Sequence, residues 1–250
     1  MLADIKMQVK MLVQQAVESY LKEELKEKKD AQIAILLGYL SQDPATVLEA
    51  VTPLVDTYDV TFLLTKEWLP LPEQWNGQSY VLIEDVQQQE WSDMIEKSSV
   101  LVIPAASYRL LSKLVLTMDD ETAVWVAIQY QLLGKPIVIA SDGVEPNVYQ
   151  QIHAPNSVQE RLQSYIRTLQ ADQVKWVPLS KLVKTVDEQL AEYQEKQTLI
   201  LAKHVERAYQ DGLKEIAVPA RSMVTPSAKD LARELKIQLK ANDSSKGGTL

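Results

Sequence analysis

The sequence predicts an α/β protein built on one open, largely parallel sheet with helices on both faces. Short, wholly apolar segments alternate with longer segments of helical periodicity, and this alternation is typical of doubly wound sheets. The apolar segments show no polar alternation, as expected of parallel strands that are buried on both faces. These expected strands are 33–37, 60–64, 80–83, 100–103 and 136–140.

Capping residues mark where the helices between these strands begin and end. Asp43-Pro44 provides an N-cap and a proline at the first helical position, so a helix is expected through Val55. Further helices are expected over 86–97, 108–116 and 121–133, the last capped by Asp119 and ended by Gly134. The first strand, helix and second strand form a β-α-β unit, which the handedness rule makes parallel.

The chain divides into five segments by composition and periodicity. An N-terminal amphipathic helix and charged linker occupy 1–30, with apolar residues spaced three and four apart. The α/β domain spans 31–178, and a polar connecting helix, more bridge than core, spans 179–197. A small α+β block follows at 198–240, with a strand at 215–218 and a helix begun by Thr225-Pro226. The polar tail, 241–250, is expected to be disordered.

Composition excludes several classes of function. The chain has no cysteine and two histidines, His153 and His204, so thiolate chemistry and multi-histidine metal centres are not expected. A net charge of -8 argues against nucleic-acid binding. An apolar run of about eighteen residues, which a membrane span needs, is missing, as is a signal peptide. The expected location is the cytoplasm.

Small and hydroxyl residues follow three of the expected strands, where doubly wound sheets bind ligands. They are Gly38 to Ser41, Thr65 with Lys66, and Pro104 to Ser107. The first segment leads into a helix N-terminus, which favours an anion such as phosphate. Taken singly, such residues are most simply caps and turns. Gly38-Tyr39-Leu40-Ser41 matches neither the dinucleotide fingerprint nor a Walker loop.

Together these segments resemble the flavoprotein family of homo-oligomeric flavin-containing cysteine decarboxylases. The likeness covers about 32–147 and is carried by Thr65-Lys66, the stretch 91–113 with Pro104 to Arg109 and Lys113, Asp119-Asp120, and 134–140. It implies a flavodoxin- or Rossmann-like fold, FMN as cofactor and a homo-oligomer of three or more chains. The implied FMN-binding residues are Gly38 and Ser41 near the phosphate, and Thr65, Pro104, Ala106, Ser107 and Tyr108.

The chain departs from the family pattern at the residues that carry out decarboxylation. Tyr108 stands where the family has a substrate-reading asparagine, and no histidine precedes His153. The resemblance therefore implies the FMN-binding scaffold but not decarboxylation, because an acid–base group cannot be named.

A second resemblance concerns the two ends of the chain. Segments 203–212, 215–219 and 224–235 resemble a tail found in cargo proteins of bacterial microcompartments, and the apolar stripe of 5–17 is similar to helices that target enzymes into those shells. Such small amphipathic units suit docking on a partner. Packing of the N-terminal helix on its own domain is an equally open reading.

Two functions follow from these observations. The first is an FMN-binding flavoprotein, a redox or cofactor-handling accessory of a microcompartment pathway, with shell or cargo proteins as partners of its terminal helices. The alternative is a non-catalytic scaffold with an eroded flavin site. His204 is expected to be a surface or packing residue.

Overall fold

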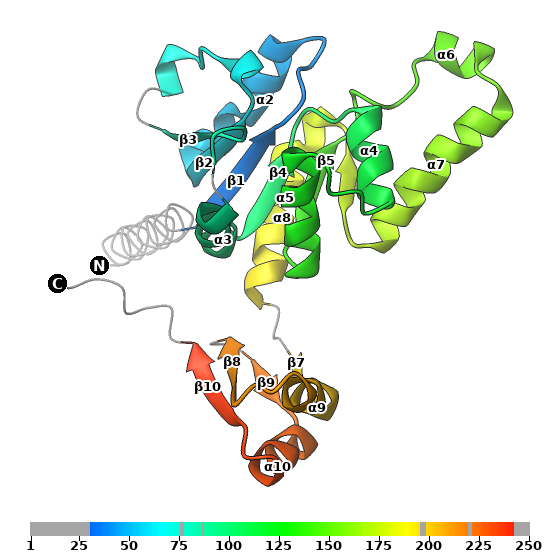
Figure 1. The fold of residues 1–250 in the computed structure, drawn as a ribbon. Coiled ribbons are helices and arrows are strands. Elements are labelled where there is room, and N and C mark those ends of the chain that lie inside the picture. Colours follow the sequence, from blue (N-terminus) through cyan, green and yellow to red (C-terminus); the bar gives the residue numbers. More distant parts are fainter. Residues whose placement is uncertain (1–30, 76–77, 87, 196–198, 220–221, 243–250) are drawn as a thin grey trace, which may run out of the picture. The chain divides into compact units, whose positions relative to one another are not determined.

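Six parallel strands form the predicted sheet, in the order β3-β2-β1-β4-β5-β6 (Figure 1). The computed structural model describes residues 31–75, 78–86, 88–195, 199–219 and 222–242. Its contacts divide the chain into Met1–Tyr193 and Gln194–Leu250, here called the N-terminal and C-terminal units. The sheet belongs to the N-terminal unit. Its strands are β1 (Gln32–Leu37), β2 (Asp59–Leu64), β3 (Ser79–Leu82), β4 (Val100–Ile103), β5 (Ile137–Ala140) and β6 (Lys175–Val177).

Helices connect these strands. They are α2 (Pro44–Thr57), α3 (Gln88–Lys97), α4 (Tyr108–Val115), α5 (Thr122–Leu132), α6 (Val148–His153), α7 (Asn156–Ala171) and α8 (Leu182–Glu195). Three short 3-10 turns lie between them: η1 (Lys66–Trp68), η2 (Glu73–Trp75) and η3 (Leu179–Lys181). The expected helix of 1–30 lies outside the described residues.

Helices cover both faces of the sheet, which confirms the predicted fold class. Successive strand residues contribute to two separate cores: Leu36 packs with α3, α4, α5 and α7, whereas Leu37 packs with α2 and α8. Both side chains are at most 1% exposed. Burial of both faces explains why these strands are apolar throughout.

The strand order reverses between β1 and β4. From β1 the chain adds β2 and then β3 on one side, and from β4 it adds β5 and then β6 on the other. This is the Rossmann order, in which ligands bind outside the carboxyl ends of the strands at the reversal. Leu37 pairs with Leu64, so β1 and β2 end level with one another.

Three elements differ from the sequence prediction. Asp119 does not cap α5: Glu121 occupies the N-cap position, with no side-chain hydrogen bond to the helix. The helix over 179–197 is not merely a bridge, because Leu182, Val186 and Leu190 of α8 are buried in the core beside α2. Helix α6, which was not predicted, has no buried residue and so gives no apolar periodicity.

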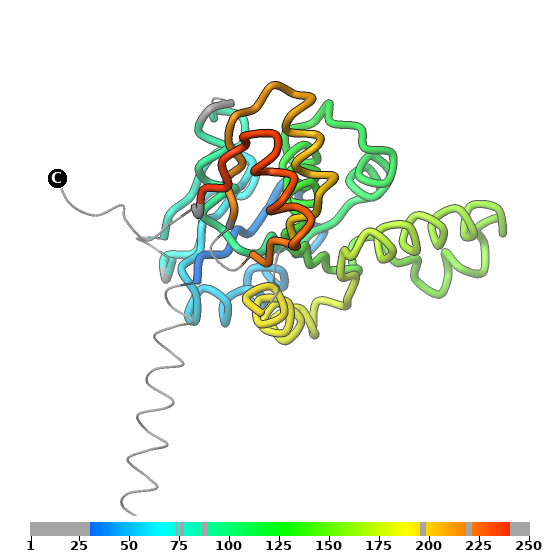
Figure 2. The backbone as a smooth tube through the Cα atoms, turned by 90° about the horizontal axis from the view of Figure 1, so that it is seen from below, coloured from blue at the N-terminus to red at the C-terminus, as the bar shows by residue number. Residues whose placement is uncertain are grey.

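Helices α6 and α7 form an arm that extends from the sheet in both views (Figures 1 and 2). Only Ile166 and Leu169, in the second half of α7, are buried. On α6, Val148, Tyr149 and Ile152 are each at least 68% exposed. The arm therefore presents apolar side chains that its own unit leaves uncovered.

The C-terminal unit has a small core of its own. Two parallel strand pairs form it, β7 (Leu199–Ile200) with β9 (Met223–Val224) and β8 (Glu215–Pro219) with β10 (Gln238–Asn242). Helices α9 (Ala202–Gln210) and α10 (Pro226–Glu234) pack through Val205, Ala208, Ala228 and Ala232. As predicted, Thr225 caps α10 and Pro226 is its first residue. Within the described parts of both units, no helix is long and apolar enough to cross a membrane.

Candidate functional site

The segments predicted to bind a ligand follow strands that are neighbours in the sheet. Gly38 to Ser41 follows β1, Pro104 to Ser107 follows β4, and Thr65 follows β2 on the far side of β1. Parallel strands place their carboxyl ends at one edge of the sheet, which we call the carboxyl edge. The structure thus brings the three predicted segments together at the strand reversal.

Two buried hydroxyl groups at the carboxyl edge have no hydrogen-bond partner among the residues that the structure describes. They are Thr65 Oγ1 after β2 and Ser141 Oγ after β5. Ser141 is 1% exposed and directly follows the strand beside β4, as Thr65 directly follows the strand beside β1. A buried hydroxyl without a partner costs about 1–3 kcal/mol, so such a group in a native protein calls for an explanation. Separate polar groups of one extended ligand would satisfy the two hydroxyls, because β1 and β4 lie between the strands that they follow.

Ser141 was missed by the sequence prediction. The signal was present, because Ser141 directly follows the apolar strand β5 just as Thr65 directly follows β2. The indole N–H groups of Trp68 and Trp75, in the connection after β2, are also buried without a partner. Trp75 stacks on Phe62 of β2 with ring centroids 4.9 Å apart. This connection therefore holds three buried donors that the chain itself does not use.

The loops after β4 and β5 are in close contact. A β carbon on Gly143 would lie 2.5 Å from the carbonyl oxygen of Ala106, so only glycine permits this approach. The contact holds the segment that follows Ser141 against the segment that contains Ala106. At the end of β1, a β carbon on Gly38 would lie 2.6 Å from Cβ of Ala123 in α5. Gly38 therefore allows α5 to pack directly against the sheet.

A hydrogen-bonded network joins the β1 loop to the start of α5. Tyr39 OH donates to Glu121 Oε2 at 2.5 Å, and Lys113 Nζ lies 2.6 Å from Glu121 Oε1. Lys113 Nζ also donates to both carboxylate oxygens of Asp120, at 2.8 and 2.7 Å. Arg109 Nη1 lies 3.7 Å from Glu121 Oε1. Lys113, which the family resemblance marks, thus forms an ion pair beside the predicted site with Asp120, one of the two aspartates that the resemblance leaves open.

The network shifts the pKa values of its members. Burial, followed by the hydrogen bond to Glu121, raises the pKa of Tyr39 well above its usual range. Burial opposes ionisation of Glu121, but hydrogen bonds from Lys113 and Tyr39 outweigh it and lower the pKa of this carboxyl. The hydrogen bond from Lys113 lowers the pKa of Asp120. Both carboxylates are therefore charged at neutral pH, and Tyr39 is a neutral donor.

The start of α2 is occupied by the protein's own side chains. Asp43 Oδ1 accepts a hydrogen bond from Thr46 N at 3.2 Å, and Thr46 Oγ1 donates to Asp43 Oδ2 at 2.6 Å. Ser41 Oγ accepts from Asp43 N at 3.2 Å. The hydrogen bond from the Thr46 hydroxyl, together with that from its amide, lowers the pKa of Asp43. A charged carboxylate therefore stands where the sequence predicted a phosphate.

The remaining predicted residues lie on the loop after β4 and the first turn of α4. Pro104 and Ala106 are buried and small. Ser107 Oγ accepts from Leu110 N at 3.1 Å and so caps α4. Tyr108 is 43% exposed. Because Pro104 and Ala106 are small, the backbone after β4 lies open to approach near the strand reversal. Ser107, in contrast, has a structural role as the cap of α4.

The histidines do not contribute to the carboxyl edge through any described contact. His153 is an exposed residue at the end of α6. His204 Nδ1 accepts from Leu201 N at 3.2 Å at the start of α9, in the C-terminal unit, as expected of a surface residue. The described residues contain no group of three or more histidine, aspartate or glutamate side chains that could hold a metal ion.

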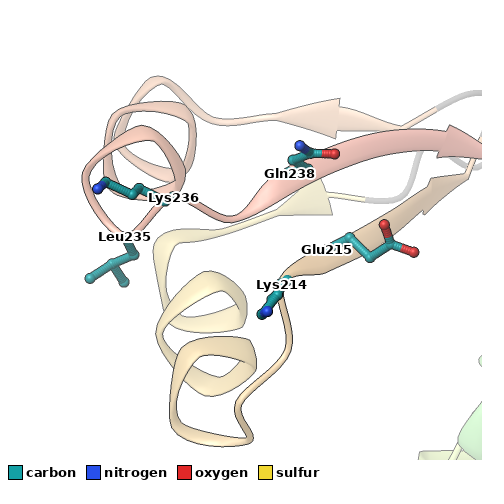
Figure 3. Close-up of a pocket in the computed structure, with 5 residues that line it drawn as sticks. All are labelled: Lys214, Glu215, Leu235, Lys236 and Gln238. Atoms are coloured by element: carbon teal, nitrogen blue, oxygen red, sulfur yellow. The ribbon is translucent and has the colours of Figure 1, made fainter.

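A pocket of about 530 Å³ lies in the C-terminal unit (Figure 3). It is lined by Lys214, Glu215, Leu235, Lys236 and Gln238. These residues come from the starts of β8 and β10 and the turns before them, that is, from the amino ends of parallel strands. Ligand sites of parallel sheets lie at the opposite ends, so we assign no function to this pocket.

No protein-family model matches the chain, and no curated protein sequence is significantly similar to it. Several solved structures are similar to part of it. The FMN-dependent cysteine decarboxylase TvaF from thioviridamide biosynthesis has a TM-score of 0.49 at 14% identity, over 64% of this chain and 98% of that chain. DmrB of Burkholderia xenovorans, solved with FMN as a cubic protein cage for redox transfer, has a TM-score of 0.49 at 17% identity, over 67% and 99%.

The FMN-binding protein AtHal3 is a third similar structure, with a TM-score of 0.42 at 18% identity over 60% of this chain and 80% of that chain. All three structures have TM-scores below 0.5 at identities of 18% or less, so the similarity assigns neither a family nor a ligand to this chain.

Proposed function

We propose that the N-terminal unit binds a flavin at the carboxyl edge, at the strand reversal between β1 and β4, with FMN as the form that the sequence resemblance implies. The observation that carries this proposal is the pair of buried hydroxyls without a partner among the described residues, Thr65 Oγ1 and Ser141 Oγ, directly after β2 and β5, the strands on either side of β1 and β4. A flavin has carbonyl, ring-nitrogen and ribityl hydroxyl groups that can accept from or donate to such hydroxyls.

Two residues at this edge carry little or no side chain. Ala106 and Gly143 bring the loops after β4 and β5 into contact, and their small size would let a flat ligand approach the backbone there. Thr65 and Ser141 would hydrogen-bond the ligand, while Pro104 and Tyr108 would border it, with Gly38 and Ser41 on the β1 side. A bound flavin supplies electron transfer, and the protein supplies binding and orientation. Tyr39 and Lys113 hold Glu121 in place beside the site.

Flavin titration of two variants tests this proposal. Thr65→Val and Ser141→Ala remove a hydroxyl without changing the backbone. Because each hydroxyl is buried and unsatisfied, we expect the flavin-free variants to be as stable as the native protein or slightly more stable. We expect the dissociation constant for FMN to rise about tenfold in each, the effect of one lost hydrogen bond.

Matched controls are Thr168→Val and Ser164→Ala on α7, whose hydroxyls donate to backbone carbonyls of their own helix. These should leave FMN binding unchanged. A colourless native protein that binds neither FMN nor riboflavin at millimolar concentration would exclude the proposal and favour the alternative, a scaffold whose flavin site is eroded.

We also propose that the chain is a homo-oligomer of three or more copies and that the arm contributes to the contact. Val148, Tyr149 and Ile152 on α6 are exposed, and contiguous exposed apolar surface is typical of interaction sites. Light scattering of the native protein and of Ile152→Asp gives the test. A monomeric native protein would rule out the oligomer.

Docking on microcompartment shell or cargo proteins remains a second proposal. In the C-terminal unit the supporting observation is a set of exposed apolar side chains, namely Leu199, Tyr209, Leu213 and Met223. The N-terminal stripe that would share this role lies outside the described residues. Deleting residues 1–30 and locating the protein in cells that form such shells tests it, because unchanged localisation would remove the targeting role of that segment.

A further inference from the structure

A phosphate at the carboxyl edge would need a free helix N-terminus or a free cation. In doubly wound sheets the phosphate of a bound nucleotide sits on the N-terminus of a helix that follows a strand, where backbone N–H groups are unpaired. Helices α2 and α4 follow β1 and β4, the strands at the reversal, and α5 begins beside Tyr39 of the β1 loop. The first turn of each is therefore the place to look for a phosphate site.

The N-terminus of α2 is closed to an anion. The carboxylate of Asp43 accepts from both the amide and the hydroxyl of Thr46, at 3.2 and 2.6 Å. A second negative charge at the same helix end would lie against this carboxylate, and like charges repel most strongly at such short range. Asp43 is exposed, so its carboxylate remains solvated and keeps its position at the helix N-terminus.

The other two helix starts offer no better site. Glu121 occupies the N-cap position of α5 and is held there by Tyr39 and Lys113. The N-terminus of α4 has Ser107 as its cap. A phosphate approaching α5 would meet the carboxylates of Glu121 and Asp120.

The nearby cations are already paired. Lys113 binds Asp120 and Glu121, with only 18% of its side chain exposed. Arg109 Nη1 lies 3.7 Å from Glu121 Oε1, and Lys66 Nζ lies 3.4 Å from Asp85 Oδ1. Arg109 and Lys66 are mostly exposed, so each would bring only a weak, solvated charge to a phosphate.

From this arrangement we infer that the site recognises the ring and ribityl chain of the flavin and gains little from the phosphate, so that riboflavin binds about as tightly as FMN. The inference rests on the proposed function. It names the ligand class more narrowly: a flavin whose terminal phosphate is not needed for recognition. Asp43 is the residue that sets this selectivity.

Titration of the full-length, flavin-free protein with riboflavin and with FMN, followed by quenching of flavin fluorescence, tests the inference. We expect the two dissociation constants of the native protein to agree within about threefold, because the described residues near the carboxyl edge offer the phosphate only weak, solvated charges. In Asp43→Asn the cap is retained, since asparagine caps helices as well as aspartate. That variant should bind FMN about fivefold more tightly and riboflavin unchanged, as expected for removal of one charge from a helix N-terminus.

Asp56→Asn is the matched control, because Asp56 is an exposed carboxylate in the last turn of the same helix. It should change neither dissociation constant. Native protein that binds FMN more than about thirtyfold tighter than riboflavin would overturn the inference and leave the proposed function standing. Equal affinities that Asp43→Asn leaves unchanged would overturn the role of Asp43. If the native protein bound neither flavin, the proposed function would fall, and this inference with it.

Discussion

Gly143 and Ala106 touch across the tips of two neighbouring strands, with room for no side chain between them. A β carbon on Gly143 would lie 2.5 Å from the Ala106 carbonyl oxygen, which cannot yield without moving the loop after β4. This contact fixes the distance between the loop that carries Ser141 and the loop that carries Ala106. The proposed flavin site therefore depends on a residue that itself offers no functional group.

Gly143→Ala should separate these two loops. We expect a loss of about 1–3 kcal/mol in the free energy of unfolding, the usual cost of forcing an extra methyl group into a packed site. Flavin affinity should fall in parallel, because Ser141 moves with its loop. Urea unfolding and FMN titration measure the two effects.

Gly212→Ala serves as the control for Gly143→Ala. Gly212 has φ +72°, and no atom lies within 4 Å of the position that a β carbon would occupy, so alanine there meets backbone strain but no clash. It should cost about 1 kcal/mol in the C-terminal unit and leave flavin binding unchanged. Native stability and affinity in Gly143→Ala would show that the loops can separate freely.

The hydrogen bond between Tyr39 and Glu121 should contribute to stability through a charged acceptor. Tyr39→Phe removes only the hydroxyl that donates to Glu121 Oε2 at 2.5 Å. We expect a loss of about 1.5–3 kcal/mol, the range for hydrogen bonds to charged groups. A double-mutant cycle with Glu121→Gln, measured by urea unfolding, isolates the pair from the contacts that Lys113 makes.

The cycle should show a coupling energy of at least about 0.5 kcal/mol, as expected for residues in direct contact. Tyr149→Phe is the control, because Tyr149 is 76% exposed and its loss should change stability by less than about 0.5 kcal/mol. Strictly additive effects of the two substitutions would mean that the hydrogen bond does not contribute.

The sheet could be predicted from sequence because its physics is local. Strands β1, β4 and β5 are buried on both faces and must therefore be apolar on both. An uninterrupted apolar run such as Ile33 to Leu37 thus indicates a buried strand. The start of α2 could also be predicted. An aspartate followed by proline suits a helix start, because the aspartate accepts from an unpaired N–H group and the proline has none. Helix α6 could not be predicted in this way, because none of its side chains is buried.

The electrostatics of the site could not be predicted in the same way. Tyr39 and Glu121 are 82 positions apart, and neither carries a pattern that indicates the other. Asp119 was the expected cap of α5, yet Glu121 takes the position because Lys113 binds it and Asp120. Thr65 was predicted to bind a ligand from its place after a strand, but only the structure shows that its hydroxyl lacks a partner among the described residues.

The ionisation of Asp43 should make part of the protein's stability depend on acid pH. Hydrogen bonds from the hydroxyl and amide of Thr46 lower the pKa of Asp43 below its ordinary value of 3.8. A carboxyl whose pKa is lower in the folded state stabilises that state above the unfolded pKa, and this contribution is lost as pH falls through the folded pKa.

Comparison with Asp43→Asn gives the measurement, because asparagine keeps the cap but does not titrate. The difference in unfolding free energy between the two proteins should be constant from pH 7 to about pH 5 and should then shift toward the variant as pH falls below 3.8. Parallel pH profiles for the native protein and Asp43→Asn would contradict the lowered pKa.

The two units should unfold separately. Val205 is fully buried in the C-terminal core, and the other side chains of that core are mainly alanines, so its apolar surface is small. Val205→Asp places an unpaired charge there, and the cost of burying it exceeds what a core of this size can supply. Hydrogen exchange should show loss of protection in β8, α9 and α10, while β1, β4 and flavin binding are unaffected.

Val205→Ala is the graded control for this experiment, with an expected loss of about 1–2 kcal/mol confined to the same unit. If Val205→Asp also removed protection from β1 and β4, the N-terminal unit would depend on the C-terminal one for its stability. Protection that survives in β1 and β4 would instead show that the flavin site is built by the N-terminal unit alone. The C-terminal unit would then be free to change its partners without altering that site.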